Sequence, residues 1–284
     1  MDGIDGRSGG VSRRAVIIGS IGVGFALAVQ PVVAQNIIVT SSEGLKAGAV
    51  MVKTPTGDIL GYRAMPASGS NFPVVLVVAE IFGLHEHIRD VVRRLAKLGY
   101  YAITVDQFWR LGDASKMPDV QTIVRDLVAK TPDAQAMGDF DAAVAFAKGE
   151  GADTAKLAIT GFCLGGRYVW LYAAHNPDLK AAVSWYGSLK GGTSDIKPKS
   201  PIDLAPDMKA PVLGLYAGQD RGITAEHIEE MKKALTAAGK KFEIVVYPDA
   251  QHGFNADYRP SYNKAAAEDG WKRMLAWFKA NGAA

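Results

Sequence analysis

Residues 157–173 constrain the fold of this chain more than any other stretch. A short apolar run at residues 157–160 is typical of a buried strand, and apolar residues at helical spacing follow up to residue 173. Between them lies Gly161-Phe162-Cys163-Leu164-Gly165-Gly166, in which small residues flank a cysteine. Because glycine allows two backbones to approach closely, the pattern predicts a tight strand–turn–helix junction with Cys163 on the turn. The N-terminus of the following helix would then favour a thiolate and a developing negative charge.

Cys163 is the only cysteine of the chain, so no internal disulfide can form. A lone cysteine is most often a small buried hydrophobic residue, and glycine-rich turns between strand and helix are common. Whether Cys163 is a nucleophile therefore depends on what the rest of the chain brings to it.

Composition places the chain among ordinary globular proteins. Its 284 residues are 48% hydrophobic and 21% charged, enough for one large core without disulfides. The net charge is +3 with no Lys/Arg cluster, which argues against a nucleic-acid partner. The chain has neither a phosphate-binding glycine loop nor a set of residues at zinc spacing, so we expect no metal and no cofactor.

The first 34 residues have the pattern of a targeting signal rather than of a folded segment. Ser12-Arg13-Arg14 precedes an apolar stretch, which ends in the small residues before and including Ala34. This resembles a twin-arginine export signal, so we expect cleavage after Ala34 and a periplasmic protein without a stable membrane anchor. The alternative is a retained transmembrane anchor, but Gly19, Gly22 and Gly24 interrupt the stretch. We therefore expect an export signal at residues 1–34, a flexible segment at 35–48 and one domain at 49–284.

Strand and helix patterns alternate along that domain. Two β-rich runs, residues 50–54 and 59–64, flank a turn and predict an antiparallel hairpin. Apolar runs predict strands at residues 72–78, 101–105, 157–160, 180–185, 212–216 and 242–247. Helical spacing predicts helices at residues 87–98, 119–128, 134–148, 225–238 and 264–280, besides the helix after Cys163. The fold class expected is α/β, a mostly parallel doubly wound sheet with an N-terminal antiparallel hairpin.

Reactive residues follow the ends of three predicted strands, in the order Cys163, Asp220 and His252. The carboxyl ends of parallel strands meet at one edge of a sheet, so we expect these side chains to converge. His252 would take the thiol proton, and Asp220 would orient the imidazole and stabilise its charged form. Taken singly, Asp220 could be a helix cap and His252 a turn residue. The order nucleophile, acid, histidine is that of the α/β-hydrolase fold.

Two backbone N–H groups are expected to bind the negative charge of a tetrahedral intermediate. One belongs to Leu164, the residue after the nucleophile, and the other to Ile81, after the strand that ends at Val78. The remaining histidines, His85, His87, His175 and His227, are weaker candidates for a site.

Five blocks of the chain together resemble the dienelactone hydrolase family (carboxymethylenebutenolidases). They are Gly161-Phe162-Cys163-Leu164-Gly165-Gly166, Glu80-Ile81-Phe82-Gly83, Asp106-Gln107-Phe108-Trp109-Arg110, Gly218-Gln219-Asp220 and His252-Gly253-Phe254. The resemblance implies hydrolysis of a small ester or lactone through an acyl-cysteine. It also implies that Glu80 helps to switch the thiol to a thiolate when substrate arrives, and that Arg110 helps to bind a substrate carboxylate.

The resemblance has one departure, since dienelactone-specific members carry a second arginine a few residues after the histidine. The first arginine after His252 here is Arg259, further along, and it is the candidate to replace that group. Trp109 and Phe254 are expected to shape the substrate pocket.

Alternatives to a small-ester hydrolase stay open at this point. One is a thioesterase or peptidase of the same fold, and another is a non-enzymatic binding protein that has kept the fold. The expected assembly is a monomer or a small homo-oligomer.

Overall fold

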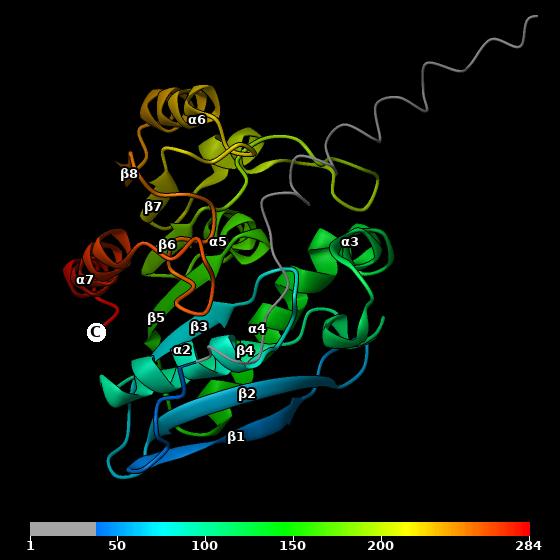
Figure 1. Ribbon diagram of the computed structural model, residues 1–284. Helices are drawn as coiled ribbons and strands as arrows, with labels where there is room; N and C mark the ends of the chain where they lie inside the picture. Colours follow the sequence, from blue (N-terminus) through cyan, green and yellow to red (C-terminus); the bar gives the residue numbers. More distant parts are fainter. Residues whose placement is uncertain (1–37) are drawn as a thin grey trace, which may run out of the picture.

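The computed structural model describes residues 38–284, and the export signal expected at residues 1–34 lies outside them. An eight-stranded sheet in the order β1-β2-β4-β3-β5-β6-β7-β8 runs through the molecule (Figure 1). The pairs β1–β2 and β2–β4 are antiparallel, and all other neighbours are parallel. The strands are β1 Leu45–Val52, β2 Ile59–Pro66, β3 Pro73–Val78, β4 Tyr101–Val105, β5 Asp153–Phe162, β6 Ala181–Trp185, β7 Val212–Ala217 and β8 Phe242–Tyr247. The predicted fold class is confirmed.

The N-terminal hairpin is longer than its sequence pattern indicates. β1 begins at Leu45, five residues before the predicted start and inside the segment expected to be flexible. Its residues Ala47, Gly48 and Ala49 lack the β-branched or aromatic side chains typical of strands. These residues are held in a strand by pairing with β2, which runs from Leu45 opposite Pro66 to Val52 opposite Ile59.

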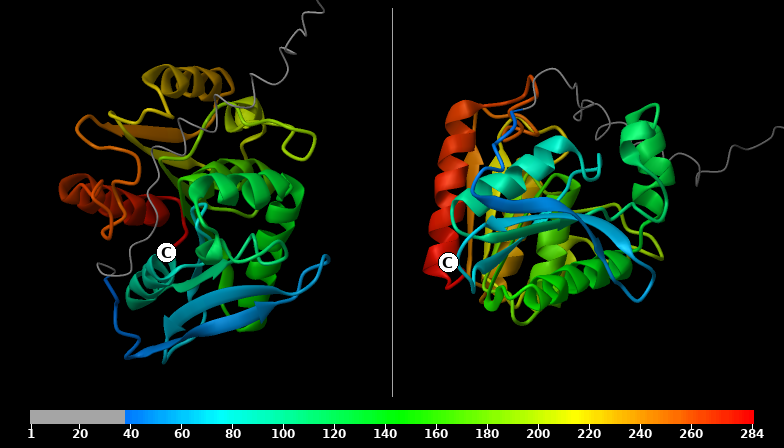
Figure 2. Two further views of the ribbon diagram at one scale, coloured as in Figure 1. Left: turned by 45° about the vertical axis from the view of Figure 1, so that its right-hand side comes forward. Right: turned by 90° about the horizontal axis from the view of Figure 1, so that it is seen from below.

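Helices cover both faces of the sheet (Figure 2). α2 (Glu86–Lys97) and α7 (Lys264–Ala280) lie on one face, and α4 (Asp133–Gly149) and α5 (Leu164–His175) lie on the other. α6 (Ala225–Ala237) joins β7 to β8, and α3 (Val120–Asp126) belongs to the excursion after β4. Short 3₁₀ helices occur at η2 Ala114–Lys116, η3 Val128–Lys130 and η4 Pro201–Asp207. Of these, η4 overlaps the end of residues 187–206, whose Gly, Ser, Pro and Lys content predicts a loop.

The buried stripe of α2 shows why the helical pattern was readable. Ile88, Val91, Val92 and Leu95 are fully buried, as their spacing predicts. Leu98, the last residue of the predicted helix, is the C-cap and is exposed, because the helix ends at Lys97. Within residues 38–284, no helix combines the length and the apolar character needed to cross a bilayer.

Candidate functional site

The junction between β5 and α5 is a strained turn that carries Cys163. Cys163 has φ 57° and ψ −115°, outside the regions that most L-residues adopt, and its side chain is buried. A Cβ on Gly161 would lie 2.5 Å from the carbonyl oxygen of Gly165, and one on Gly165 would lie 2.2 Å from that of Val78. Only glycine fits at these two positions, so the predicted reason for the Gly-x-Cys-x-Gly pattern is confirmed.

Asp220 follows β7 and His252 follows β8, and the two side chains form a hydrogen bond. His252 Nδ1 and Asp220 Oδ2 are 2.7 Å apart. The other carboxylate oxygen of Asp220 accepts the N–H groups of Gly222 at 2.8 Å and Ile223 at 3.2 Å. Burial opposes ionisation of Asp220, but the charge and hydrogen bond of His252, with these N–H groups, lower the pKa of Asp220. The carboxylate is thus held in one position and in its charged form.

His252 also interacts with Cys163. Burial alone would lower the pKa of the His252 imidazole, because burial penalises the charged ring. The negative charge of Cys163, the Asp220 hydrogen bond and a hydrogen bond with the Cys163 side chain raise the pKa of His252 to about 10. The structure therefore brings Cys163, His252 and Asp220 together at the carboxyl edge of the sheet, in a cluster able to hold a proton on the imidazole beside the sulfur.

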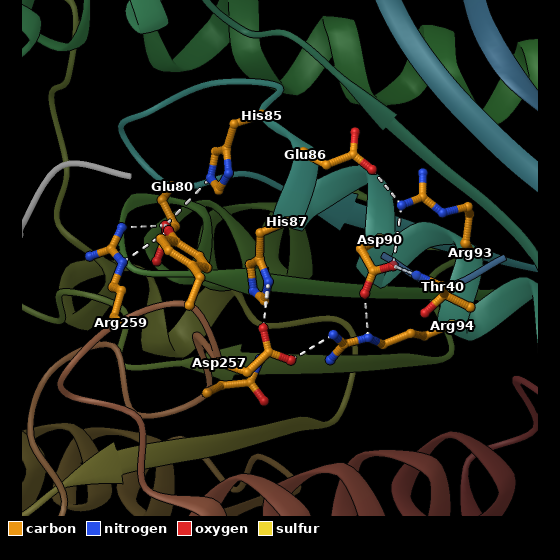
Figure 3. Close-up of polar contacts among 12 residues, drawn as sticks. Thr40, Glu80, His85, Glu86, His87, Asp90, Arg93, Arg94, Asp257 and Arg259 are labelled. Atoms are coloured by element: carbon orange, nitrogen blue, oxygen red, sulfur yellow. Dashed lines mark hydrogen bonds and ion pairs between the residues drawn. The ribbon is translucent and has the colours of Figure 1, made fainter. Parts of the chain in front are cut away.

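Glu80, just after β3, is a buried carboxylate with several partners (Figure 3). Arg259 Nη2 lies 2.8 Å from Glu80 Oε2, the Tyr258 hydroxyl donates to the same oxygen at 3.1 Å, and His85 Nε2 is 3.6 Å away. Burial alone would raise the pKa of Glu80, but Arg259, with help from His85, lowers it well below the usual range. Arg259 thus turns inward, although it follows His252 at a longer offset than the family's second arginine.

A second polar group lies next to Glu80 and was not expected from the sequence. The rings of His85 and His87 stack with centroids 6.1 Å apart, and His87 Nδ1 lies 3.3 Å from Asp257 Oδ1. Arg94 Nη2 donates to Asp257 Oδ2 at 2.6 Å, which continues the group to the surface of α2 (Figure 3). His85 is the N-cap of α2, outside the helix, so helical spacing says nothing about how close its ring comes to that of His87. No group of three or more potential metal ligands occurs in the part of the chain that the structure describes.

Arg110 forms its hydrogen bonds away from this cluster. Its guanidinium donates to both oxygens of Asp139 at 2.9 Å each, and to Thr54 Oγ1 at 2.6 Å. It also donates to the carbonyl oxygens of Thr56 and Gly57, each at 3.1 Å. These contacts tie the β1–β2 turn to α4 and do not involve Cys163, Glu80 or His252.

The other predicted residues occupy different surroundings. Phe254 is fully buried, and its ring packs against those of Trp185, Tyr186 and Tyr247 at 5.2–5.8 Å. Trp109 is 45% exposed. Leu164 is the first residue of α5, where a helix leaves its N–H groups without an intrahelical partner, and Ile81 is buried next to Glu80.

Comparison with known proteins places these observations in a family. The family model for the dienelactone hydrolase family matches residues 59–282. A protein of Methylorubrum extorquens assigned as a carboxymethylenebutenolidase is 59% identical over 275 residues, which cover 96% of this chain and 94% of its own. One of Escherichia coli with the same assignment is 52% identical and covers 91% of this chain and 96% of its own.

A solved structure leads to the same family. The crystal structure of a Klebsiella pneumoniae protein assigned as a dienelactone hydrolase superposes with a TM-score of 0.81 at 50% identity. It covers 83% of this chain and 98% of its own. The resemblance carried by the five sequence blocks is therefore confirmed: the chain belongs to the dienelactone hydrolase family, and it is a hydrolase with the α/β-hydrolase fold.

Proposed function

We propose that this protein hydrolyses small esters or lactones, with Cys163 as nucleophile, His252 as general base and Asp220 as the group that orients the imidazole. The observation that supports this proposal best is the position of His252, which interacts with Cys163 while its Nδ1 is bonded to Asp220 at 2.7 Å. Relatives assigned as carboxymethylenebutenolidases support the choice of a lactone or ester substrate.

The chemistry follows from the three side chains. His252 takes the proton of Cys163, and the thiolate attacks the carbonyl carbon to form a tetrahedral intermediate. The N–H groups of Leu164 and Ile81 stabilise its oxyanion. When the C–O bond breaks, His252 gives its proton to the alkoxide and an acyl-cysteine remains. The resulting alcohol departs if the substrate is an ester and stays attached to the acyl chain if it is a lactone. A water molecule, deprotonated by His252, then releases the acid and restores the thiol.

Glu80 and Arg259 give the proposal a second part. The Glu80 carboxylate is held by Arg259 at 2.8 Å and by the Tyr258 hydroxyl at 3.1 Å. A substrate that carries its own carboxylate would compete for Arg259 and release Glu80, which would then help His252 to convert the Cys163 thiol to a thiolate. This assigns the carboxylate-binding role to Arg259 and not to Arg110, whose guanidinium is bonded to Asp139 and the β1–β2 turn.

The test compares wild type, Cys163→Ala, Cys163→Ser and His252→Ala on p-nitrophenyl acetate and a panel of neutral and anionic lactones. We expect Cys163→Ala and His252→Ala to lose roughly 1,000-fold or more in kcat/KM, because each removes a part of one catalytic unit. Cys163→Ser should keep the fold and lose most activity, since a site suited to a thiolate need not activate a hydroxyl. If all four proteins hydrolyse these substrates equally, the assignment of the nucleophile and base is wrong.

The same panel separates the other candidates when a thioester and a short peptide are added. Turnover confined to either would replace the ester-hydrolase proposal by a thioesterase or a peptidase. Failure of wild type to act on any of these substrates would favour a binding protein.

A further inference from the structure

Tyr186 stands next to Cys163 at the carboxyl edge of the sheet. β5 and β6 are parallel neighbours in which Phe162 pairs with Trp185, so Cys163 and Tyr186 are the next residues along the two strands. The Cys163 N–H donates to the carbonyl oxygen of Trp185 at 3.0 Å, which keeps this pairing up to the turn. The Tyr186 N–H donates to the carbonyl oxygen of Leu215 at 2.8 Å and ties the residue to β7 as well.

The backbone of Tyr186 is held in a conformation that few L-residues adopt. Its φ is 40°, and among residues 38–284 the other non-glycine residues with positive φ are Cys163 and Asn71. The next residue, Gly187, packs against the first turn of α5 so closely that a Cβ there would lie 2.3 Å from the carbonyl carbon of Gly166. Surrounding structure of this kind can maintain a strained residue, and strained residues concentrate at functional sites.

The Tyr186 side chain is fixed by aromatic neighbours and ends in an unpaired hydroxyl. Its ring centroid lies 5.0 Å from that of His252 and 5.2 Å from that of Phe254. The hydroxyl is buried and has no hydrogen-bond partner within the described residues. Burial, followed by the charge of Glu80, raises the pKa of Tyr186 well above its ordinary value. The hydroxyl therefore keeps its proton and can donate a hydrogen bond. The other ionisable groups acting on it are Arg259, Cys163 and Tyr258.

Buried polar groups are nearly always paired, so an unpaired donor beside a nucleophile calls for an explanation. A substrate bound at Cys163 would bring oxygen atoms, which are hydrogen-bond acceptors, to this part of the molecule. We propose that Tyr186 is a catalytic residue whose hydroxyl donates a hydrogen bond to an oxygen of the ester group under attack at Cys163, most strongly in the transition state. The proposal rests on the hydrolase function proposed above.

The test is Tyr186→Phe, which keeps the aromatic ring and removes only the hydroxyl. We expect kcat on p-nitrophenyl acetate to fall roughly 100-fold, the scale of losing one preorganised donor. KM should stay within about threefold of wild type, because the bond forms mainly in the transition state. The melting temperature should not fall, since the hydroxyl makes no bond in the free protein, and the pH profile should keep its shape.

A matched control is Tyr100→Phe. Tyr100 is also buried, but it precedes β4 at the amino edge of the sheet and packs against Phe278. Its variant should keep kcat within twofold of wild type.

Several results would overturn the proposal. They are a kcat for Tyr186→Phe within twofold of wild type, a change confined to KM, or a loss of kcat together with a lower melting temperature. If Tyr186→Phe is active and Cys163→Ala is inactive, the catalytic role of Tyr186 is wrong and the proposed hydrolase function stands. If the wild type is inactive, both the role of Tyr186 and the proposed hydrolase function are wrong.

Discussion

At the scale of single residues, the ion pair between Glu80 and Arg259 has unusual surroundings. Both side chains are almost fully buried, with 2% and 4% of their surface exposed. The Arg259 guanidinium also lies 4.9 Å from the centre of the Phe82 ring, so an aromatic face completes its surroundings. Loss of one partner would leave the other charge buried and unpaired, which costs far more than loss of an exposed pair.

Replacement of this carboxylate should therefore destabilise the protein in a pH-dependent way. Glu80→Gln should lower the free energy of unfolding by about 3 kcal/mol at pH 7. The pKa of Glu80 is lower in the folded chain than its ordinary value of 4.5, because Arg259 and His85 outweigh burial. Its stabilisation is thus complete above pH 4.5 and is lost as the pH falls from there toward the folded pKa. Urea unfolding of both proteins between pH 3 and 7 measures this difference.

Glu243→Gln is the matched control, because Glu243 pairs with Arg273 at 3.0 Å while its side chain is 45% exposed. Its effect on unfolding should be small at every pH. A gap between wild type and Glu80→Gln that widens as the pH falls would contradict the assigned role of the pair.

At the scale of elements, the β5–α5 junction depends on how closely a strand and a helix can approach. Gly165 in the first turn of α5 lies against the end of β3, with no room for a side chain between it and Val78. The same closeness places the N-terminus of α5 beside the loop that carries Glu80 and Ile81. The turn therefore positions two parts of the candidate site at once.

Gly165→Ala tests this packing. A Cβ at 2.2 Å from the Val78 carbonyl oxygen forces β3 and α5 apart, so we expect a lower melting temperature and loss of most esterase activity. Gly138→Ala in α4 is the control, since a Cβ there meets no atom within 4 Å. It should stabilise the helix by roughly 0.5–1 kcal/mol and leave activity unchanged. Equal behaviour of the two variants would show that the approach of α5 to β3 does not matter.

The helices and strands that the sequence predicts well are those with a regular spacing of apolar residues or a continuous apolar run. α7 and β8 have the expected bounds, and the strands of the parallel region differ from prediction mainly at their ends. β1 begins earlier than its sequence pattern predicts, because its N-terminal residues owe their strand conformation to pairing with β2 and not to their own propensity. Side-chain direction in loops has no period, so the inward turn of Arg259 and the contacts of Arg110 with α4 could not be read from the sequence.

The positions of Cys163, Asp220 and His252 could be inferred because strand ends in a parallel sheet share one edge. Their catalytic roles stay a prediction until the variants are measured. His85, His87 and Asp257 were missed, since their proximity depends on how α2 and the loop before α7 pack together.

At the scale of the whole molecule, the first described residues are tied to α2. The Thr40 N–H donates to Asp90, and Lys97 Nζ donates to the carbonyl oxygen of Glu43 (Figure 3 shows the Thr40 contact). Asp90 is fully buried and also accepts from Arg94 and Arg93, so the start of the described chain joins a network within the fold.

We propose that the protein is exported by the twin-arginine route and that the mature chain begins at Gln35. Expression in a bacterium followed by fractionation and N-terminal sequencing of the periplasmic protein measures this directly. Arg13→Lys combined with Arg14→Lys should leave the protein in the cytoplasm with its N-terminus intact, because the paired arginines are the recognised part of the signal. Recovery of the uncleaved wild-type chain from the membrane fraction would favour a retained anchor instead.

The order of the site residues along the chain has a consequence for biosynthesis. The thiol follows the fifth strand in sequence, whereas the Asp220 carboxylate and the His252 imidazole follow the seventh and eighth, so both are translated after it. A polypeptide that ends between residues 164 and 251 holds the sulfur of Cys163 but lacks His252, the proposed base. With His252 as the proposed base, such truncated products should show no esterase turnover.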